Sequence, residues 1–436
     1  MPDLVSLLTP AQRAIFDAVR QAATHRGVSA YLVGGAVRDW LLGLPTIDDL
    51  DFVIEGDAIA LADQLRQSYG GEVHAYPKFG TATWQRDEVT VDLATARREE
   101  YPRPAALPVV FPSDLPTDLR RRDFTINAIA MKLDDGALID PLGGQEDLRL
   151  GVMRVIHARS FIDDPTRMLR GARYAARFGF ALAPESQAAL MAGLPHLRAL
   201  SGERMKYDLE LIFEERAPEE ALKQLRAWGC FQAIGIPVPD DAQLSWRFGR
   251  AREALWAGEW PIASLQLAPR QLLHAIGWAA ITYHLGQLAI ARWIEWIPFD
   301  AHLRDALVAL GPLSSLATAV FCAKRSRISR LLREFSGLSL FLAYLFETSK
   351  LKRDALLCEW KDWRWVRPVT TGDDLRALGL PPGPAYGRIL DRLRSAWLDE
   401  EIHSYAEEQR LLATLIEAER GYVHSDKPPP LRGDAG

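Results

Sequence analysis

The residues Tyr31-Leu-Val-Gly34-Gly35-Ala-Val-Arg38-Asp39-Trp-Leu-Leu-Gly43 set the architecture of the N-terminal part of the chain. A short β-like run enters the glycine pair, and a helical pattern follows directly. Two glycines let backbone N–H groups approach an anion closely, and a helix N-terminus adds partial positive charge. Arg38 lies one turn into this helix and can reach the same anion. The segment indicates a phosphate cradle, although a glycine pair before a helix is equally often structural.

Two aspartates follow the glycine pair, in Asp49-Leu50-Asp51 at the start of the next expected strand. Residues i and i+2 of a strand share a face, so both carboxylates should point the same way. Close carboxylates repel each other unless a cation lies between them, and Mg²⁺ accepts one or two carboxylates together with substrate phosphates. A lone pair of this kind is more often a solvated acidic turn. Behind a phosphate cradle, it predicts a polymerase-type nucleotidyl transfer site, with Asp92 as a candidate third carboxylate.

The pattern around these motifs predicts an α/β head followed by helices. Residues 28–155 alternate β-like and helical runs, whereas from Phe161 onward the periodicity is helical almost to the end. We expect a helix at Ala58–Tyr69 and strands at Val28–Val33, Asp49–Ile54, Glu72–Tyr76, Thr81–Gln85 and Val89–Ala94. Further divisions are expected near residues 155, 215 and 365.

Composition narrows the class of protein. A chain of 436 residues with 48% hydrophobic residues should form several packed units. A net charge of −5 argues against coating nucleic acid through bulk charge. Three widely spaced cysteines are expected to be buried and unpaired, which favours a reducing, cytoplasmic location. We find neither a secretion signal nor an apolar run that could span a bilayer, so no membrane is expected.

A second constellation is Arg121-Arg122-Asp123-Phe124-Thr125-Ile126-Asn127-Ala128-Ile129-Ala130-Met131. Asp123 is a suitable N-cap for an apolar helix over the following residues, and its carboxylate can also fix a neighbouring arginine. Arg122 would then be positioned for a ribose or a triphosphate. The alternative is a basic helix entry without any ligand.

A third constellation is an arginine-rich helix after Asp163-Asp164-Pro165. Half of its circumference carries Asp164, Arg167, Arg170, Arg173 and Arg177. A solvated face would normally mix in Glu and Lys, whereas arginine suits bidentate recognition of phosphates and base edges. Asp and Arg three residues apart present an acceptor beside a donor, which matches the amino group and ring nitrogen of cytosine or adenine but neither guanine nor uracil. A purely structural arginine helix is the alternative.

Together these segments resemble the class II tRNA nucleotidyltransferases and their bacterial poly(A) polymerase relatives. The resemblance covers roughly residues 30–180 and is carried, in order, by LVGGAVRDWLLG, DLD, RRDFTINAIAM, DPLGGQEDL and DDPTRMLRGARYAARFGF. Residues Val369–Arg388 also look like the C-terminal part of this family. Relatives often have Glu-Asp where this chain has Asp163-Asp164, so an acidic residue is retained at both positions.

The resemblance implies a polymerase-β-like nucleotidyltransferase head over residues 1–155, a neck with the base-recognition helix over 156–215, a helical body over 216–365 and a helical tail over 366–424. Residues 425–436 are expected to be disordered because of their composition. Carried over to this chain, the resemblance assigns Asp49 and Asp51 to catalysis and Mg²⁺ binding. It assigns nucleotide binding to Gly34, Gly35, Arg38, Arg122, Asp164, Arg167, Arg170 and Arg173.

The implied activity is addition of CCA, or of its terminal A, to the 3′ end of tRNA from CTP and ATP, without a nucleic-acid template. The RNA 3′-hydroxyl would attack the α-phosphate in line, with two Mg²⁺ ions assisting. Residues Arg97–Pro108 fill the place of a loop that A-adding members carry, and their prolines suggest a mobile segment outside regular structure. This favours A addition. CC-only and poly(A) addition remain alternatives, as do an inactive RNA- or nucleotide-binding relative and a small-molecule nucleotidyltransferase.

Two later segments are candidates for holding RNA. Lys324–Arg333 contains five basic residues and no acid, which suits either an RNA path or a solvated helix face. Glu359–Arg367 interleaves tryptophans with basic residues, and such a stripe is more often core than a stacking surface. The oligomeric state does not follow from the sequence.

Overall fold

The computed structural model describes residues 4–47, 49–283, 285 and 287–425. The chain forms two compact units, of which the first contains Met1–Leu244 and Glu295–Pro298 and the second contains Ser245–Ile294 and Phe299–Gly436. The expected finer divisions near residues 155, 215 and 365 stay predictions. The tail expected to be disordered lies, apart from Ser425, outside the described residues.

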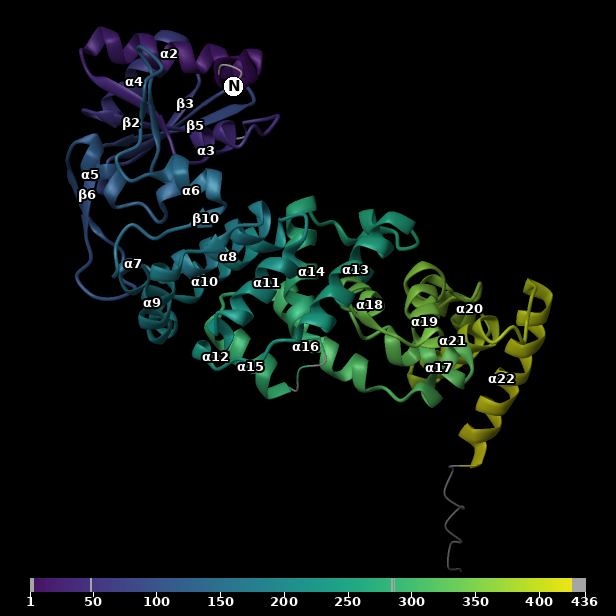
Figure 1. The fold of residues 1–436 in the computed structure, drawn as a ribbon. Coiled ribbons are helices and arrows are strands. Elements are labelled where there is room, and N and C mark those ends of the chain that lie inside the picture. The colour runs from purple at the N-terminus through teal and green to yellow at the C-terminus, as the bar shows by residue number, and fades with distance from the viewer. Residues whose placement is uncertain (1–3, 48, 284, 286, 426–436) are drawn as a thin grey trace, which may run out of the picture. The chain divides into compact units, whose positions relative to one another are not determined.

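The first unit contains a mixed sheet of seven strands in the order β3-β4-β5-β2-β1-β8-β9 (Figure 1). Neighbouring strands are antiparallel except for the parallel pair β2 and β5. The strands are β1 Ser29–Val33, β2 Leu50–Glu55, β3 Glu72–Tyr76, β4 Thr81–Arg86, β5 Val89–Thr95, β8 Ala130–Lys132 and β9 Leu138–Ile139. The strands expected in residues 28–94 are confirmed, with ends that shift by one residue at most.

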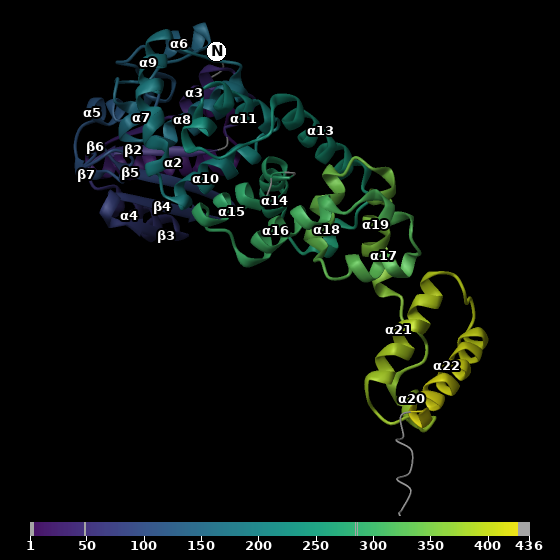
Figure 2. The same ribbon diagram turned by 90° about the horizontal axis from the view of Figure 1, so that it is seen from below.

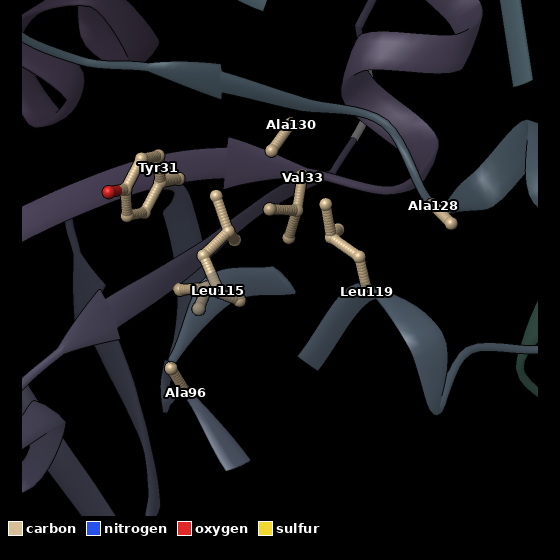
Figure 3. Packing of buried hydrophobic residues seen from close by; sticks show 8 residues of the cluster. Tyr31, Val33, Ala96, Leu115, Leu119, Ala128 and Ala130 are labelled. Carbon is tan, nitrogen blue, oxygen red and sulfur yellow. The ribbon is translucent and has the colours of Figure 1, made fainter. Parts of the chain in front are cut away.

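Alternation along β1 and β2 divides the buried side chains between the two faces of the sheet. One face packs on α2 (Pro10–Arg26) and α4 (Ala58–Tyr69), and the rings of Phe16 and Phe52 lie 6.3 Å apart there. On the other face, Tyr31 and Val33 pack with Leu115 and Leu119 of α5 (Leu115–Arg120), as Figure 3 shows. With both faces covered, the sheet is a rigid base for the polar residues at its edge.

The segment after Asp123 does not form the expected apolar helix. It forms a 3₁₀ turn, η2 (Thr125–Asn127), and then β8, which pairs with β1 in the sheet. The sheet therefore takes up these apolar residues because β1 offers an unpaired edge beside them. Asp123 caps no helix. Its carboxylate accepts hydrogen bonds from the N–H of Phe124 and from the Asn127 side chain.

Helices follow the sheet, with one short interruption. The two-residue strand β11 (Ala181–Leu182) pairs in parallel with β10 (Val152–Met153). The prediction of an α/β head followed by helices is otherwise confirmed. The remaining elements of this unit are α1 Leu4–Leu7, α3 Gly35–Leu41, η1 Pro77–Phe79, β6 Arg97–Glu100, β7 Val109–Pro112, α6 Gly144–Leu150, α7 Ser160–Asp163, α8 Thr166–Phe178, α9 Pro184–Gly193, η3 Leu194–Ala199, α10 Gly202–Phe213, α11 Pro218–Ala227 and α12 Cys230–Ile234.

The described part of the second unit is helical. All residues of α18 (Gly337–Phe346) are buried, so this helix forms the centre of the unit. Near the C-terminus, α21 (Pro384–Leu398) lies beside α22 (Tyr405–Ser425) around Leu393 and Leu412 (Figure 2). Two helices, α13 (Asp241–Ala257) and α15 (Gln287–Trp296), contain residues of both units. The others are η4 Ile262–Leu265, α14 Pro269–Thr282, α16 Ala301–Ser315, η5 Thr318–Cys322, α17 Arg325–Leu332, α19 Lys350–Lys361, η6 Trp363–Trp365 and α20 Gly372–Ala377.

The prediction that the three cysteines are buried is correct for only one of them. All three are free, but Cys230 alone is buried, while Cys322 is exposed and Cys358 is half-buried. Their apolar thiols are small enough to remain at a surface at little cost, so spacing alone did not reveal their burial. Among the described residues, no helix combines the length and the apolar character that crossing a membrane requires.

Candidate active site

A cavity of about 1120 Å³ in the first unit is lined by all of the predicted site residues. They come from the β1–α3 turn, the start of β2, the segment before η2 and the region of α7 and α8. The lining includes Gly34, Gly35, Arg38, Asp49, Asp51, Arg122, Asp164, Arg167, Arg170 and Arg173. The fold thus brings these residues together around one space, and their individual roles stay predictions.

Gly34 allows the β1–α3 turn to pass close to two charged groups. Its φ is +68°, a conformation that residues with a side chain rarely adopt. A Cβ atom at this position would lie 3.1 Å from Nη1 of Arg122 and 4.0 Å from Oδ2 of Asp51. The Gly34 N–H donates to the carbonyl of Ile129, which fixes the turn against the neighbouring strand segment. A side chain here would therefore strain the backbone and require the Arg122 guanidinium to shift, while its contact with Asp51 would be an ordinary one.

Carboxylates gather where β2 and β5 lie side by side. Asp51 of β2 is in register with Asp92 of β5, and Asp49 directly precedes β2. Burial, with a smaller contribution from the charges of Asp92 and Asp49, raises the pKa of Asp51 to about 6 against the opposing effect of Arg122. Asp92 accepts a hydrogen bond of 2.6 Å from the Thr83 hydroxyl. The protein thus gathers three carboxylates at this end of the sheet, with Arg122 as the cation that acts most strongly on Asp51.

This group of carboxylates fits a divalent cation that also contacts a phosphate. Within the described residues, no three His, Cys, Asp or Glu side chains are arranged closely enough to hold a metal ion by themselves. Mg²⁺ rarely needs such a cage, because it binds one or two carboxylates and completes its coordination with water and substrate phosphates. Asp49 and Asp51 offer the hard oxygen ligands that such a shared site requires.

Arg122 is held by an acid that sequence reasoning missed. Asp118 of α5 is fully buried and accepts hydrogen bonds from Nη2 of Arg122 (3.2 Å) and Nε of Arg121 (2.9 Å). Burial alone would raise the pKa of Asp118, but the two guanidinium groups hold the pKa below its usual value. The spacing of three and four residues between Asp118 and these arginines was the available signal.

Arg38 is enclosed by protein groups. It is 4% exposed, and it donates to Oδ1 of Asn127 and to Oδ1 of Asp39, each at 2.7 Å. Its guanidinium carbon lies 5.0 Å from the ring centre of Tyr174 and 4.7 Å from that of Phe178. These contacts join α3 to α8, so the geometry favours a role in positioning the cradle as much as one in direct phosphate contact.

Asp164 and Arg167 lie at the junction of α7 and α8, and each keeps part of its hydrogen-bonding capacity. Oδ1 of Asp164 accepts from the Thr166 hydroxyl and from Nη2 of Arg204, each at 2.6 Å. Arg167 donates through Nη1 to Ser160 and through Nη2 to the carbonyl of Arg121. In the part of the chain that the structure describes, Oδ2 of Asp164 accepts no hydrogen bond, and Arg167 uses two of the five N–H groups of its guanidinium in these bonds.

The other arginines of α8 pair with, or lie near, two acids, Asp123 and Glu215. Nε of Arg170 donates to Oδ2 of Asp123 at 2.8 Å, and Arg170, together with the Asn127 side chain, keeps the pKa of Asp123 low despite its burial. Arg177 pairs with Glu215, which lies 4.0 Å from Nε of Arg173. These pairs orient the α8 face that the sequence predicted.

The segment Arg97–Pro108 contains regular structure, contrary to expectation. Its first four residues form β6, which pairs antiparallel with β7. Arg97 and Arg121 both bind the carboxylate of Glu99, which is 5% exposed. This buried ion pair holds the start of the segment in the hairpin, and the prolines come only later, in residues 101–108, where no helix or strand forms.

Helix α10 adds cavity residues that no motif had singled out. Arg204 reaches Asp164, and Asp208 is 7% exposed with a pKa that burial raises to about 6, against the effect of Arg170. Tyr207 also faces the cavity. The spacing of these residues along a helix did not indicate a site, because the sequence does not show which part of the protein this helix face contacts.

The two segments considered for RNA lie in the second unit. The basic side chains of Lys324–Arg333 pair with acids of α21 and of the turn after it: Lys324 with Glu401, Arg325 with Glu400, and Arg330 and Arg333 with Asp391. Trp360 stacks on Trp260 with ring centres 6.4 Å apart, whereas Trp365 is 60% exposed. The role of both segments in RNA binding stays a prediction.

Comparison with known proteins agrees with the architecture. Residues 30–154 match the family model described as poly A polymerase head domain. An A-adding tRNA nucleotidyltransferase of Geobacter sulfurreducens is 32% identical over 89% of this chain, and one of Halalkalibacterium halodurans is 40% identical over 49% of it. The chain covers 45% and 52% of these relatives, about half their length. A solved CCA-adding enzyme in an apo form has a TM-score of 0.78 and 25% identity, with 95% of this chain and 97% of that chain covered.

The sheet, the cavity and the carboxylates at its edge define a head of the poly(A) polymerase type. The chain belongs to the family of class II tRNA nucleotidyltransferases and bacterial poly(A) polymerases, as its motifs indicated.

Proposed function

We propose that this protein adds nucleotides to the 3′ end of tRNA without a nucleic-acid template, and that it adds CCA or its terminal A from CTP and ATP. The observation that carries the proposal is the single cavity that Asp49 and Asp51 share with Asp164 and Arg167. A metal-binding carboxylate pair and a donor–acceptor pair for a base edge occur there together. The names of the A-adding relatives and of the similar solved structure support the same activity.

In the proposed reaction, the protein's own groups bind and orient the substrates. The turn at Gly34 and the guanidinium of Arg122 face the triphosphate, while Asp164 Oδ2 and the free N–H groups of Arg167 face the base edge. Cytosine and adenine each offer an amino donor beside a ring-nitrogen acceptor, so one Asp–Arg pair accepts both and leaves guanine and uracil mismatched.

Asp49 and Asp51 are the proposed ligands for Mg²⁺, which supplies Lewis-acid activation of the attacking 3′-hydroxyl and charge neutralisation at the phosphates. Nucleotidyl transfer of this kind generally depends on metal ions. The position of Asp49, Asp51 and Asp92 along the lining of one cavity supports the assignment of Mg²⁺. No protein nucleophile is required, because the RNA 3′-hydroxyl attacks the α-phosphate and pyrophosphate leaves.

The subtype is tested with three RNAs and labelled nucleotides. Substrates that end at the discriminator base, at C and at CC are each incubated with CTP, with ATP, and with GTP or UTP as controls. Addition of A to the RNA ending in CC alone indicates an A-adding protein, whereas addition of CCA to the first RNA indicates a full CCA-adding one. Absence of incorporation on all three RNAs would contradict the proposal.

The other readings predict different products in the same assay. A CC-adding protein stops after two residues, and a poly(A) polymerase continues past one A. An inactive relative would bind RNA or nucleotide without transfer, and the retained Asp49 and Asp51 argue against it. The expected cytoplasmic location stays a prediction.

A further inference from the structure

Tyr207 differs from the other tyrosines that line the cavity. Tyr174 is buried against Arg38 and Arg173, and the Tyr101 hydroxyl donates to Glu99. Tyr207 is 62% exposed, and in the described part of the chain its ring and hydroxyl have no hydrogen-bond, ring or cation–π partner. An aromatic ring left open within a cavity is a candidate contact for a ligand.

Tyr207 lies on the face of α10 that also contacts one of the proposed base-recognition groups. The cavity is lined by one face of this helix, through Glu203, Arg204, Tyr207, Asp208 and Leu211. One turn before Tyr207, Arg204 donates to Asp164 at 2.6 Å. The ring therefore belongs to the helix face whose arginine contacts the acid proposed to read the base.

The electrostatic surroundings suit a nucleic-acid base better than an apolar molecule. The cavity is also lined by Arg122, Arg167, Arg170 and Arg173. Carboxylates such as Asp123 and Asp208 line the cavity as well, so the ring lies in a strongly polar space. Proteins that bind single-stranded nucleic acid combine cations that attract phosphates with an aromatic ring that stacks on a base.

We propose that Tyr207 is a stacking platform for a nucleobase in this cavity. The base is either that of the incoming nucleotide or the 3′-terminal base of the RNA, since both present the same planar ring. This inference rests on the proposed function. Stacking needs the ring and not the hydroxyl, so phenylalanine should replace tyrosine and alanine should not.

The experiment compares the full-length chain with Tyr207→Ala, Tyr207→Phe and the control Tyr405→Ala. Tyr405 has a similar exposure of 58% and begins α22 in the second unit. Steady-state addition of A is measured while ATP and an RNA ending in CC are varied separately. Tyr207→Ala should raise one KM about tenfold, as expected when a stacked ring is removed, whereas Tyr207→Phe and Tyr405→Ala stay close to the original chain.

The substrate whose KM changes identifies the base. A higher KM for ATP alone assigns the incoming nucleotide, and a higher KM for RNA alone assigns the 3′-terminal base. Unchanged KM values for Tyr207→Ala, or a defect that Tyr207→Phe shares, would overturn the stacking proposal while the activity stands. An unsubstituted chain that extends no RNA would instead contradict the proposed function, and the stacking proposal would fall with it.

Discussion

Helices α8 and α17 both concentrate arginine, but the surroundings of their arginines differ. In α8, Arg170 meets the carboxylate of Asp123, which is 6% exposed, and the helix lines a cavity. In α17, Arg325 is 48% exposed and pairs at the surface with Glu400, which is 61% exposed. Arginine content alone therefore does not indicate a ligand site, because the burial of the partner acid decides how strongly the cation is held and oriented.

The two helices also differ in how many charged or polar groups near them are available to bind a ligand. The cavity that α8 lines also contains the carboxylates of Asp51 and Asp92, and among the described residues Asp164 and Arg167 use only part of their hydrogen-bonding capacity. Around α17, the acids of α21 and the following turn take up most of the basic groups. The following predictions separate a site that acts on a ligand from a surface that neutralises itself.

The largest effect is expected for Asp49→Ala. Removing a carboxylate proposed to hold Mg²⁺ should lower the rate of nucleotide addition by at least about 100-fold, by analogy with other lost electrostatic groups at reacting centres. RNA affinity should remain, because Asp49 is exposed and structurally dispensable. Single-turnover incorporation and RNA binding are measured together, with Asp63→Ala, an exposed aspartate of α4, as the control. Near-normal incorporation by Asp49→Ala would disprove its assignment as a metal ligand.

Arg170→Met should produce the largest loss of stability in the α8 region. The substitution leaves the buried carboxylate of Asp123 without its cation, which should cost about 2 to 3 kcal/mol, less than for a fully buried pair because Arg170 is itself 38% exposed. Urea unfolding measures the change, and Arg177→Met, whose partner Glu215 is 12% exposed, is the matched control. Equal losses for the two variants would show that the deeper burial of Asp123 makes no difference.

Asp208→Asn should stabilise the protein near neutral pH. Burial raises the pKa of Asp208 to about 6 in the folded chain, from 3.8, so the folded state binds more protons than the unfolded state between these values. Stability contributed by this group is therefore lost as pH rises from about 4 to 6. The free energy of unfolding of the variant should exceed that of the original chain by about 1 to 2 kcal/mol above pH 6 and by little at pH 4. Urea unfolding at several pH values tests this, and a pH-independent difference would contradict it.

The smallest effect is expected for the double variant Lys324→Gln and Arg325→Gln. Exposed ion pairs contribute little to stability, so the unfolding temperature should hardly change. RNA affinity should also stay nearly constant, because Glu400 and Glu401 already neutralise these side chains. Fluorescence anisotropy with labelled RNA over a range of salt concentrations measures it. An affinity loss of about tenfold with a flatter salt dependence would show that α17 contacts phosphates.

Local patterns in the sequence were sufficient for the α/β head, the Gly34 turn, the aspartate pair and the arginine face of α8. Each depends on residues close together in the chain, where strand alternation, glycine conformation and helical periodicity act directly. The strands in residues 28–94 were therefore placed to within one residue.

Long-range contacts settled the remaining features. The apolar residues after Asp123 joined the sheet because β1 lay beside them, and Arg97–Glu100 formed a strand because Glu99 is buried between two arginines. The exposure of Tyr207 and the pairing of Lys324 with Glu401 depend in the same way on which distant segments pack together. Burial and charge compensation are properties of the three-dimensional neighbourhood, and no short stretch of residues contains that information.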